Sequence, residues 1–343
     1  MVFQIPGMSM PPIFVEGDTL LKGNFSKDFW KILPKLALQY QMSPTSQIYL
    51  SASKGYKTGG YNEQVFSDVL QDALTESLMR NVFKTIPPNI KVPGMPSMGG
   101  GASIEDRLSY DPETSWTYEL GGRYEMLERK LSLTYAFFYT HVDNLQIAQL
   151  AKQGTAGRTI ANAGKSESKG FELSLKYVPL NNLSLFAEYG FSDTRFVNYE
   201  TEIAEGGETK KIDYAGNYVP FAPRHTLGLG ASYIHHLPYG SLIDRLIGNI
   251  QYQGAGKIYW TESNQHAAGT EELSQPFYGI TNASIAVEKG AFGLECWVKN
   301  LFDTKYHSFL FEQDDVTTGK TNILVQRGYP TRFGATLRYT FNR

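Results

Sequence analysis

The sequence has no long hydrophobic run, almost no cysteine and almost no net charge. A membrane-spanning helix needs about 18 consecutive apolar residues, and the densest aromatic run, Tyr135–Tyr139, is far shorter. The single cysteine, Cys296, excludes an internal disulfide. A net charge of −2 gives no overall field that would attract nucleic acid. No nucleophile and base occur in a recognisable catalytic setting, so the sequence predicts neither an enzyme nor a bound cofactor.

Aromatic residues and glycine, by contrast, are abundant. The 343 residues include 22 Tyr, 20 Phe and 33 Gly, whereas only 19% of the residues are charged. Such a composition is typical of all-β proteins, and of transmembrane barrels in particular.

The strongest signal is an alternation of apolar and polar side chains with a period of two. Near the C-terminus, Phe333, Ala335, Leu337 and Tyr339 are separated by polar or small residues. Successive strand side chains point to opposite faces of a sheet, so such a segment has one apolar and one polar face. The same alternation occurs at residues 36–40, 116–125, 131–140, 171–177, 183–189, 227–233 and 292–299.

Short and long connections alternate between these segments. The short ones are Ser43–Ser46, Glu125–Lys130, Val178–Asn182 and Glu288–Ala291, with His236–Asp244 intermediate in length. The long polar ones are Thr58–Asp111, Ala151–Arg158, Tyr199–Val219, Glu262–Gln275 and Glu312–Asn322, and Ser67–Phe83 is predicted to form a helix within the first. An up-and-down outer-membrane barrel is built in this way, with short turns at one end and long loops at the other.

The sequence therefore predicts an all-β fold, an antiparallel up-and-down transmembrane β-barrel. Counting back from the C-terminus gives about eleven strands, preceded by a loop or partial strand at residues 1–28. We expect lipid to be faced by Leu133, Phe137, Leu175, Leu185, Leu229 and Leu337. We expect the lumen to be faced by Thr134, Ser174, Gly228 and Thr336.

Six motifs follow one another along the chain. They are Ser53–Asn62, Glu119–Arg123, Asn162–Glu172, Ala222–Thr226, Asn300–Tyr306 and Gly328–Gly334, the last followed by a terminal strand that ends near Phe341. In this order they resemble the motifs of TonB-dependent outer-membrane receptors. Family members usually end on an aromatic residue, whereas here Asn342 and Arg343 follow. The resemblance covers essentially the whole chain and implies about half of a plugged, 22-stranded barrel.

This resemblance implies energised uptake of a scarce large ligand, with a ferric siderophore as the expected one, in the outer membrane of a Gram-negative bacterium. Residues 1–28 resemble neither a plug domain nor a signal peptide. We therefore expect residues 29–343 to be the C-terminal portion of the barrel. The implied partners are outer-membrane lipid, an N-terminal barrel half with its plug, and a TonB-type energy-coupling protein that acts through that plug. Siderophore, cobalamin and glycan receptors share these motifs.

Two other classes remain open. One is a passive porin-like channel. The other is a soluble all-β ligand-binding or carbohydrate-binding module, which would bury its apolar faces internally.

Charged side chains on the predicted lumen face are candidates for a transport path. They are Glu119, Arg123, Glu172, Lys176, Glu188, Glu295, Lys299 and Arg338. Ion pairing between neighbouring strands is the alternative, and we favour it. We expect the motifs at residues 300–306 and 328–334 to shape strand ends rather than to contact ligand.

No metal or phosphate site is expected. His235 and His236 would point to opposite faces of a strand. Soft-metal capture by Met79, Met95 and Met98 has no paired His or Cys nearby. Asp314-Asp315 with Thr317 and Thr318 lacks the calcium-loop pattern, and Gly99–Gly101 follows no strand, as a phosphate loop would. Ligand-binding residues stay unassigned.

Overall fold

The computed structural model describes residues 2–3, 13–14, 16–20, 24–85, 105, 108–150, 158–205, 208–265, 272–314 and 321–341. Within this part of the chain, no helix is long and apolar enough to cross a membrane.

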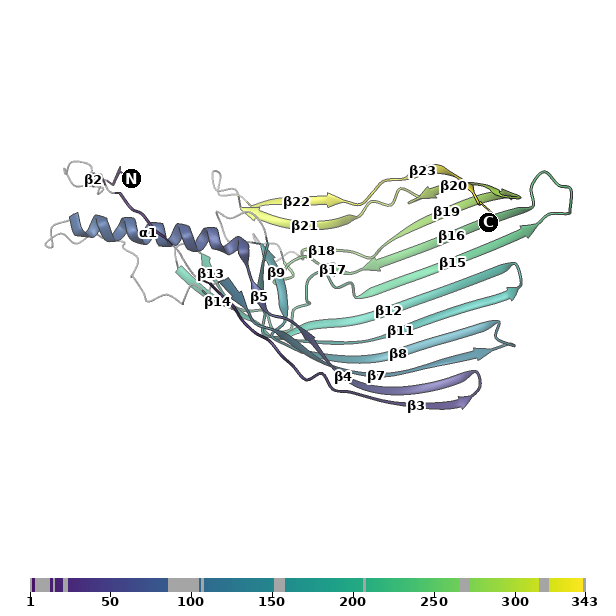
Figure 1. Cartoon of the computed structure of the whole chain (residues 1–343), viewed down its shortest axis with the longest axis horizontal. Helices are drawn as coiled ribbons and strands as arrows, with labels where there is room; N and C mark the ends of the chain where they lie inside the picture. Colours follow the sequence, from purple (N-terminus) through teal and green to yellow (C-terminus); the bar gives the residue numbers. More distant parts are fainter. Residues whose placement is uncertain are drawn as a thin grey trace. The chain divides into compact units, whose positions relative to one another are not determined.

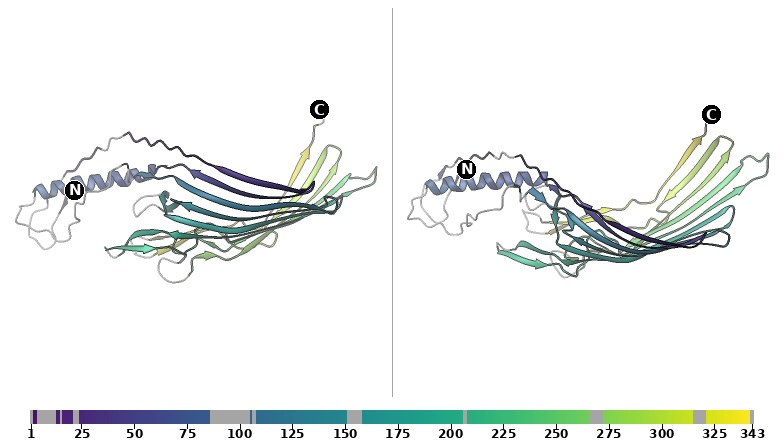
Figure 2. Two further views of the ribbon diagram at one scale, coloured as in Figure 1. Left: turned by 90° about the horizontal axis from the view of Figure 1, so that it is seen from below. Right: turned by 60° about the horizontal axis from the view of Figure 1, so that its bottom comes forward.

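Eleven strands form one antiparallel sheet, and strands that are neighbours in the sheet follow one another along the chain (Figure 1). They are β3 (Lys35–Ser43), β4 (Ser46–Lys57), β7 (Glu113–Met126), β8 (Leu131–Asp143), β11 (Lys165–Leu180), β12 (Leu183–Asn198), β15 (His225–His236), β16 (Arg245–Gly256), β19 (Tyr278–Lys289), β20 (Phe292–Lys299) and β23 (Arg332–Tyr339). The predicted up-and-down order of about eleven strands is confirmed. The outermost strands are β3 and β23, and Figure 2 shows that the sheet is curved rather than flat.

Short turns lie at one end of this sheet and long connections at the other, as the sequence predicted. The long connections carry further strands, however. They contain the pairs β9 (Gln146–Leu150) with β10 (Arg158–Asn162), β13 (Glu200–Glu205) with β14 (Glu208–Asp213), β17 (Ile258–Tyr259) with β18 (Ser274–Gln275), and β21 (His307–Asp314) with β22 (Thr321–Arg327). Tyr199–Val219 is a long connection as predicted, and within it β13 and β14 pair along their whole length, which the sequence did not indicate.

The chain divides into two compact units. The first comprises Met1–Ile32, Tyr56–Thr114 and Asn144–Ala163, and the second comprises Leu33–Gly55, Ser115–Asp143 and Gly164–Arg343. The first unit holds β1 (Val2–Phe3), β2 (Ile13–Phe14), β5 (Gly60–Tyr61), η1 (Glu63–Val65), α1 (Phe66–Thr85), β6 (Ser109–Tyr110), β9 and β10. The helix predicted at Ser67–Phe83 is confirmed and extends by a residue or two at each end.

Residues that share a chemical character also share a face of the sheet. Leu175 lies opposite Leu133 on β8 and Ala187 on β12, and Ala187 lies opposite Leu229 on β15. One position away, Ser174 lies opposite Thr134 and Glu188. Because side chains alternate along each strand, these two rows point in opposite directions. We call the two sides the apolar face and the polar face.

No described part of the chain covers the apolar face. Leu36 on β3 is 67% exposed, Phe137 on β8 is 53% exposed, and Phe333 on β23 is 84% exposed. Burial of such a side chain typically stabilises a soluble protein by about 1.5–3 kcal/mol. A contiguous exposed surface of this kind marks a contact with lipid or with another protein. The buried hydrophobic cluster of Trp260, Leu273 and Leu310 lies instead among the long connections.

Candidate functional site

The polar face carries a hollow of about 440 Å³ near the middle of the sheet. Its polar lining includes Thr134, Glu172, Ser174, Glu188, Gln251 and Gln253. Glu172 lies opposite Gly190, and Glu188 lies opposite Gly228. Because Gly228 has no side chain, the Glu188 carboxylate lies against its backbone, whereas the Thr226 side chain lies against Gly190.

The charged residues predicted for the lumen lie on this face, but the predicted pairing between strands is wrong for them. Glu172 and Glu188 lie opposite glycine, alanine or serine, and Lys299 lies opposite Arg332, a like charge. Among the described residues, ion pairs are absent from Glu119, Glu172, Lys176, Glu188, Glu295, Lys299 and Arg338. The eighth residue, Arg123, pairs within its own strand with Glu125, at 2.8 Å between Nη2 and Oε1.

Three of these charges have other polar neighbours on the polar face. The Tyr49 hydroxyl donates a hydrogen bond of 2.6 Å to the Glu119 carboxylate. A second hollow, of about 180 Å³, brings Glu295 and Arg338 together beside the ion pair of Arg245 and Glu288. The polar face therefore presents carboxylates and cations that are open to whatever fills the space on that side.

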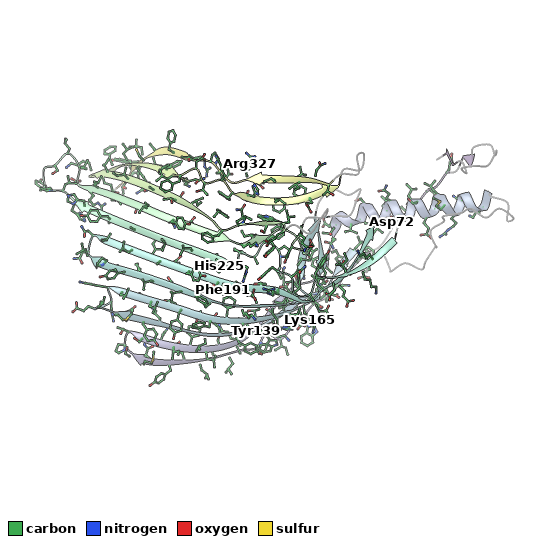
Figure 3. All side chains as sticks on the ribbon, turned by 180° about the vertical axis from the view of Figure 1, so that it is seen from behind. Asp72, Tyr139, Lys165, Phe191, His225 and Arg327 are labelled. Atoms are coloured by element: carbon green, nitrogen blue, oxygen red, sulfur yellow. The ribbon has the colours of Figure 1, made fainter. Side chains whose placement is uncertain are left out.

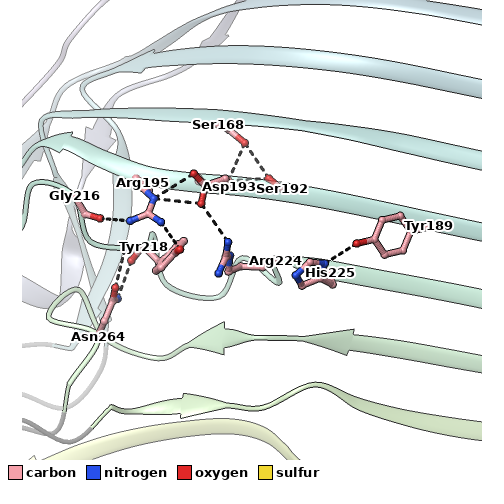
Figure 4. A network of polar contacts seen from close by, with 11 residues as sticks. Ser168, Tyr189, Ser192, Asp193, Arg195, Gly216, Tyr218, Arg224, His225 and Asn264 are labelled. Carbon is pink, nitrogen blue, oxygen red and sulfur yellow. Dashed lines mark hydrogen bonds and ion pairs between the residues drawn. The ribbon is translucent and has the colours of Figure 1, made fainter.

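A polar network ties the long connections to the end of β12 (Figure 4). Arg195 Nε donates to both Asp193 carboxylate oxygens at 3.2 Å, and Nη1 donates to the Gly216 carbonyl at 2.9 Å. The Arg195 guanidinium also donates to the Tyr218 hydroxyl and lies 3.9 Å from the centre of the Tyr218 ring. Tyr218 exchanges two backbone bonds with the Asn264 amide, at 2.7 and 2.9 Å. Arg195 thereby anchors two connections to one strand.

Burial also changes the pKa of a tyrosine in these connections. Burial, and then a hydrogen bond to the Glu272 carboxylate, raises the pKa of Tyr259. The Tyr259 ring is stacked on that of Tyr218 at 4.8 Å between centroids. Tyr259 is therefore a neutral donor at every physiological pH, and the stack extends the anchor around Arg195.

The motifs at residues 300–306 and 328–334 hold strand ends together, as predicted. The Asn300 side chain, 4% exposed, donates to the carbonyls of Thr304 and Tyr329 at 3.0 Å and accepts from the Thr304 N–H at 2.9 Å. Thr331 Oγ1 donates to the Asn300 carbonyl at 2.6 Å. A Cβ at Gly328 would overlap the Tyr306 ring, so only glycine fits there.

The remaining candidates form no metal site in the part of the chain that the structure describes. His235 and His236 occupy adjacent positions at the short-turn end of β15, so they point to opposite faces. Met79 lies on α1, whereas Met95, Met98, Gly99–Gly101, Asp315, Thr317 and Thr318 lie outside the described residues. Asp314 ends β21. Cys296 is exposed and free.

An up-and-down sheet with one uncovered apolar face and one polar face defines a class of protein, the wall of a membrane β-barrel. The family model for the TonB dependent receptor-like β-barrel matches residues 14–301 of this chain, and the chain belongs to that family.

The comparisons with individual proteins agree with this family. The pesticin receptor of Yersinia pestis is 26% identical over 305 residues, which are 88% of this chain and 36% of the relative. A probable TonB-dependent siderophore receptor, PiuA of Acinetobacter baumannii, is 29% identical over 57% of this chain and 24% of its own length. The solved ferric yersiniabactin uptake receptor FyuA of Yersinia pestis matches 90% of this chain and 37% of its own, with a TM-score of 0.61 and 23% identity. The chain thus spans between 24% and 37% of the length of these relatives.

Proposed function

We propose that this chain forms part of the wall of an outer-membrane receptor that imports a ferric siderophore in a Gram-negative bacterium. The observation that carries the proposal is the uncovered apolar face on a sheet of this family. An apolar face of this kind is stable against lipid tails, because contact with them leaves no apolar surface exposed to water. The siderophore is supported by the names of two relatives, a siderophore receptor and a ferric yersiniabactin uptake receptor.

The proposal includes strands and a plug beyond this sheet. In the described sheet β3 and β23 each have a free edge, and lipid cannot satisfy the backbone groups of a sheet edge. We propose that residues 29–343 are the C-terminal portion of a larger barrel that a preceding half completes. A TonB-type coupling protein would then act through a plug inside that barrel.

The polar face would line the lumen in this arrangement. Glu172 and Glu188 flank the larger hollow without an ion-pair partner among the described residues, and they are the residues that we place on the transport path. Carboxylates are hydrated when exposed and need a donor when a passing group displaces their water. Their removal should therefore change transport more than it changes folding.

Uptake of a ⁵⁵Fe-loaded siderophore by cells that carry the full-length gene tests this function. We expect uptake to require the coupling protein and to stop when a protonophore is added. Glu172→Gln with Glu188→Gln should lower the uptake rate about tenfold or more at an unchanged protein level, on the scale of one lost charge-assisted hydrogen bond. Glu128→Gln, in the short turn between β7 and β8, should leave uptake unchanged. Uptake that continues without the coupling protein would sink the proposal.

Two measurements distinguish the proposed receptor from a passive porin-like channel and from a soluble binding module. A passive channel would give steady conductance in planar bilayers, whereas a plugged receptor would not. A soluble module would stay in solution without detergent. The exposed apolar face already argues against that class, because no described part of the chain buries it.

A further inference from the structure

An aromatic row crosses the apolar face near the long-connection end of the sheet. Phe137, Phe171, Phe191 and His225 come from four neighbouring strands and lie directly opposite one another in the register. Their ring centroids are 6.1, 6.0 and 5.2 Å apart. Figure 3 labels Phe191 and His225 of this row, with Tyr139 nearby. In membrane barrels aromatic girdles lie at the level of the lipid headgroups.

Two cations lie directly beyond this row, on the side of the long connections. Lys169 precedes Phe171 by two residues and therefore occupies the next position of the apolar face, between Tyr139 and Asp193 in the register. The Arg224 guanidinium lies 5.9 Å from the Phe191 ring centroid and 4.6 Å from that of Tyr218. Arg224 therefore stands on the same face as the aromatic row.

These two cations have bonding capacity that the fold does not use. Arg195 satisfies Asp193, whereas Arg224 approaches the same carboxylate only to 3.7 Å. The Arg224 side chain donates no hydrogen bond to a described residue, although its Nε atom is buried. Lys169 is exposed and has neither a hydrogen bond nor an ion pair within the described part of the chain. The Arg224 guanidinium is held against two rings, and its Nη atoms donate no hydrogen bond to a described residue, so they fit a phosphate, which a guanidinium binds as a rigid fork.

We propose that Arg224 and Lys169 bind the phosphate of a phosphorylated glycolipid in the outer leaflet, whose acyl chains lie along the apolar face below. The aromatic row argues for a lipid, because it joins the cations to an uncovered apolar surface without a break. The row lies near the long-connection end of the sheet, which places the two cations at the level of the lipid headgroups. This inference rests on the proposed function, since it needs the apolar face to contact the outer leaflet.

The test measures binding of diphosphoryl lipid A to the full-length protein in detergent, by native mass spectrometry. Arg224→Gln and Lys169→Gln should each weaken binding about tenfold, as expected for a charge-assisted bond to phosphate. The matched control is Lys299→Gln. Lys299 also lies over a ring, 5.6 Å from the Trp297 centroid at the same end of the sheet, but on the polar face. Its replacement should leave lipid binding unchanged.

Three outcomes would overturn the inference. They are equal effects of Arg224→Gln and Lys299→Gln, equal binding of dephosphorylated lipid A, and full competition by inorganic phosphate at the concentration of the lipid. Siderophore uptake and heat-modifiable mobility of the same variants report separately on the proposed function. Both should stay at the wild-type level in Arg224→Gln even if the lipid site is wrong, and both should be absent from the wild type if the receptor assignment is wrong.

Discussion

At the scale of single residues, adjacent positions on one strand face opposite surroundings. Leu337 on β23 lies opposite Leu294 and is 75% exposed on the apolar face, whereas Thr336 lies opposite Glu295 on the polar face. Leu337→Arg should lower the free energy of unfolding by about 2–4 kcal/mol if the residue lies near the bilayer midplane. Thr336→Arg should cost less than about 1 kcal/mol, because water and Glu295 solvate the guanidinium. Unfolding of the full-length protein in phospholipid vesicles measures both, and equal costs would refute the assignment of faces.

The second prediction at this scale concerns the free energy of unfolding and the buried residue Asn300. Asn300→Ala removes three side-chain hydrogen bonds, to Thr304 and Tyr329. It also places alanine at a φ of +51°, in the left-handed region. We expect a loss of about 3 kcal/mol, at about 1 kcal/mol for each bond. The control, Asn249→Ala, removes one exposed bond of 3.2 Å to Ser284 and should cost less than about 1 kcal/mol. A similar loss at both positions would show that Asn300 is not the joint between the two motifs.

At the scale of elements, one carboxylate makes the short-turn end sensitive to acid. Asp244 accepts hydrogen bonds from Lys289 Nζ at 2.7 Å and from the Gly290 N–H at 2.8 Å. These bonds, first that of Lys289, hold the pKa of Asp244 below its usual value. A carboxyl group with a lowered folded pKa stabilises the folded state above its unfolded pKa of about 4, and this stabilisation is lost as the pH falls through the folded value.

The Asp244→Asn variant tests that linkage. It should be less stable than the wild type at pH 7 and should approach the wild type at low pH, as Asp244 becomes protonated. Denaturant unfolding at the two pH values gives the comparison, and Glu128→Gln serves as the control without a predicted effect. A stability difference that stays the same at both pH values would show that the charge of Asp244 is not what matters.

The arrangement of the connections predicts which of them reach the cell surface. Because an even number of strands separates them, Thr58–Asp111 and Tyr199–Val219 should lie on the extracellular side, and Ser43–Ser46 and Val178–Asn182 on the periplasmic side. In a Cys296→Ser background of the full-length protein, a membrane-impermeant maleimide should label Ala215→Cys on intact cells and spare Asn181→Cys until the cells are opened. The reverse labelling pattern would show that the barrel has the opposite orientation in the membrane.

The regular elements could be predicted from sequence, and the contacts between connections could not. Alternation such as that around Leu133 and Phe137 reports the local geometry of a strand, so the sheet and its order follow from it. The hairpin of β13 and β14 has no apolar face, since Thr201, Lys210 and Lys211 interrupt any alternation. Arg224 and Phe191 come together only through long-range pairing, and no local pattern marks them.

At the scale of the whole molecule, the sheet has to be completed by other strands. Its eleven strands are an odd number, whereas bacterial single-chain barrels have even numbers. The free edges of β3 and β23 each present a row of backbone donors and acceptors. Leaving such groups unpaired in lipid costs several kcal/mol for each group.

Residues 1–343 expressed alone should therefore aggregate or pair with a second copy rather than form a folded monomer. We expect no heat-modifiable monomer band on gels and no siderophore-dependent growth. Expression together with the strands and plug that complete the barrel should restore both, because β3 and β23 would then find partners. Lumen charges such as Glu172 and Lys176 would also face protein rather than bulk water. A detergent-soluble monomer of residues 1–343 that binds a ferric siderophore would show that this sheet is self-sufficient and that the half-barrel interpretation is wrong.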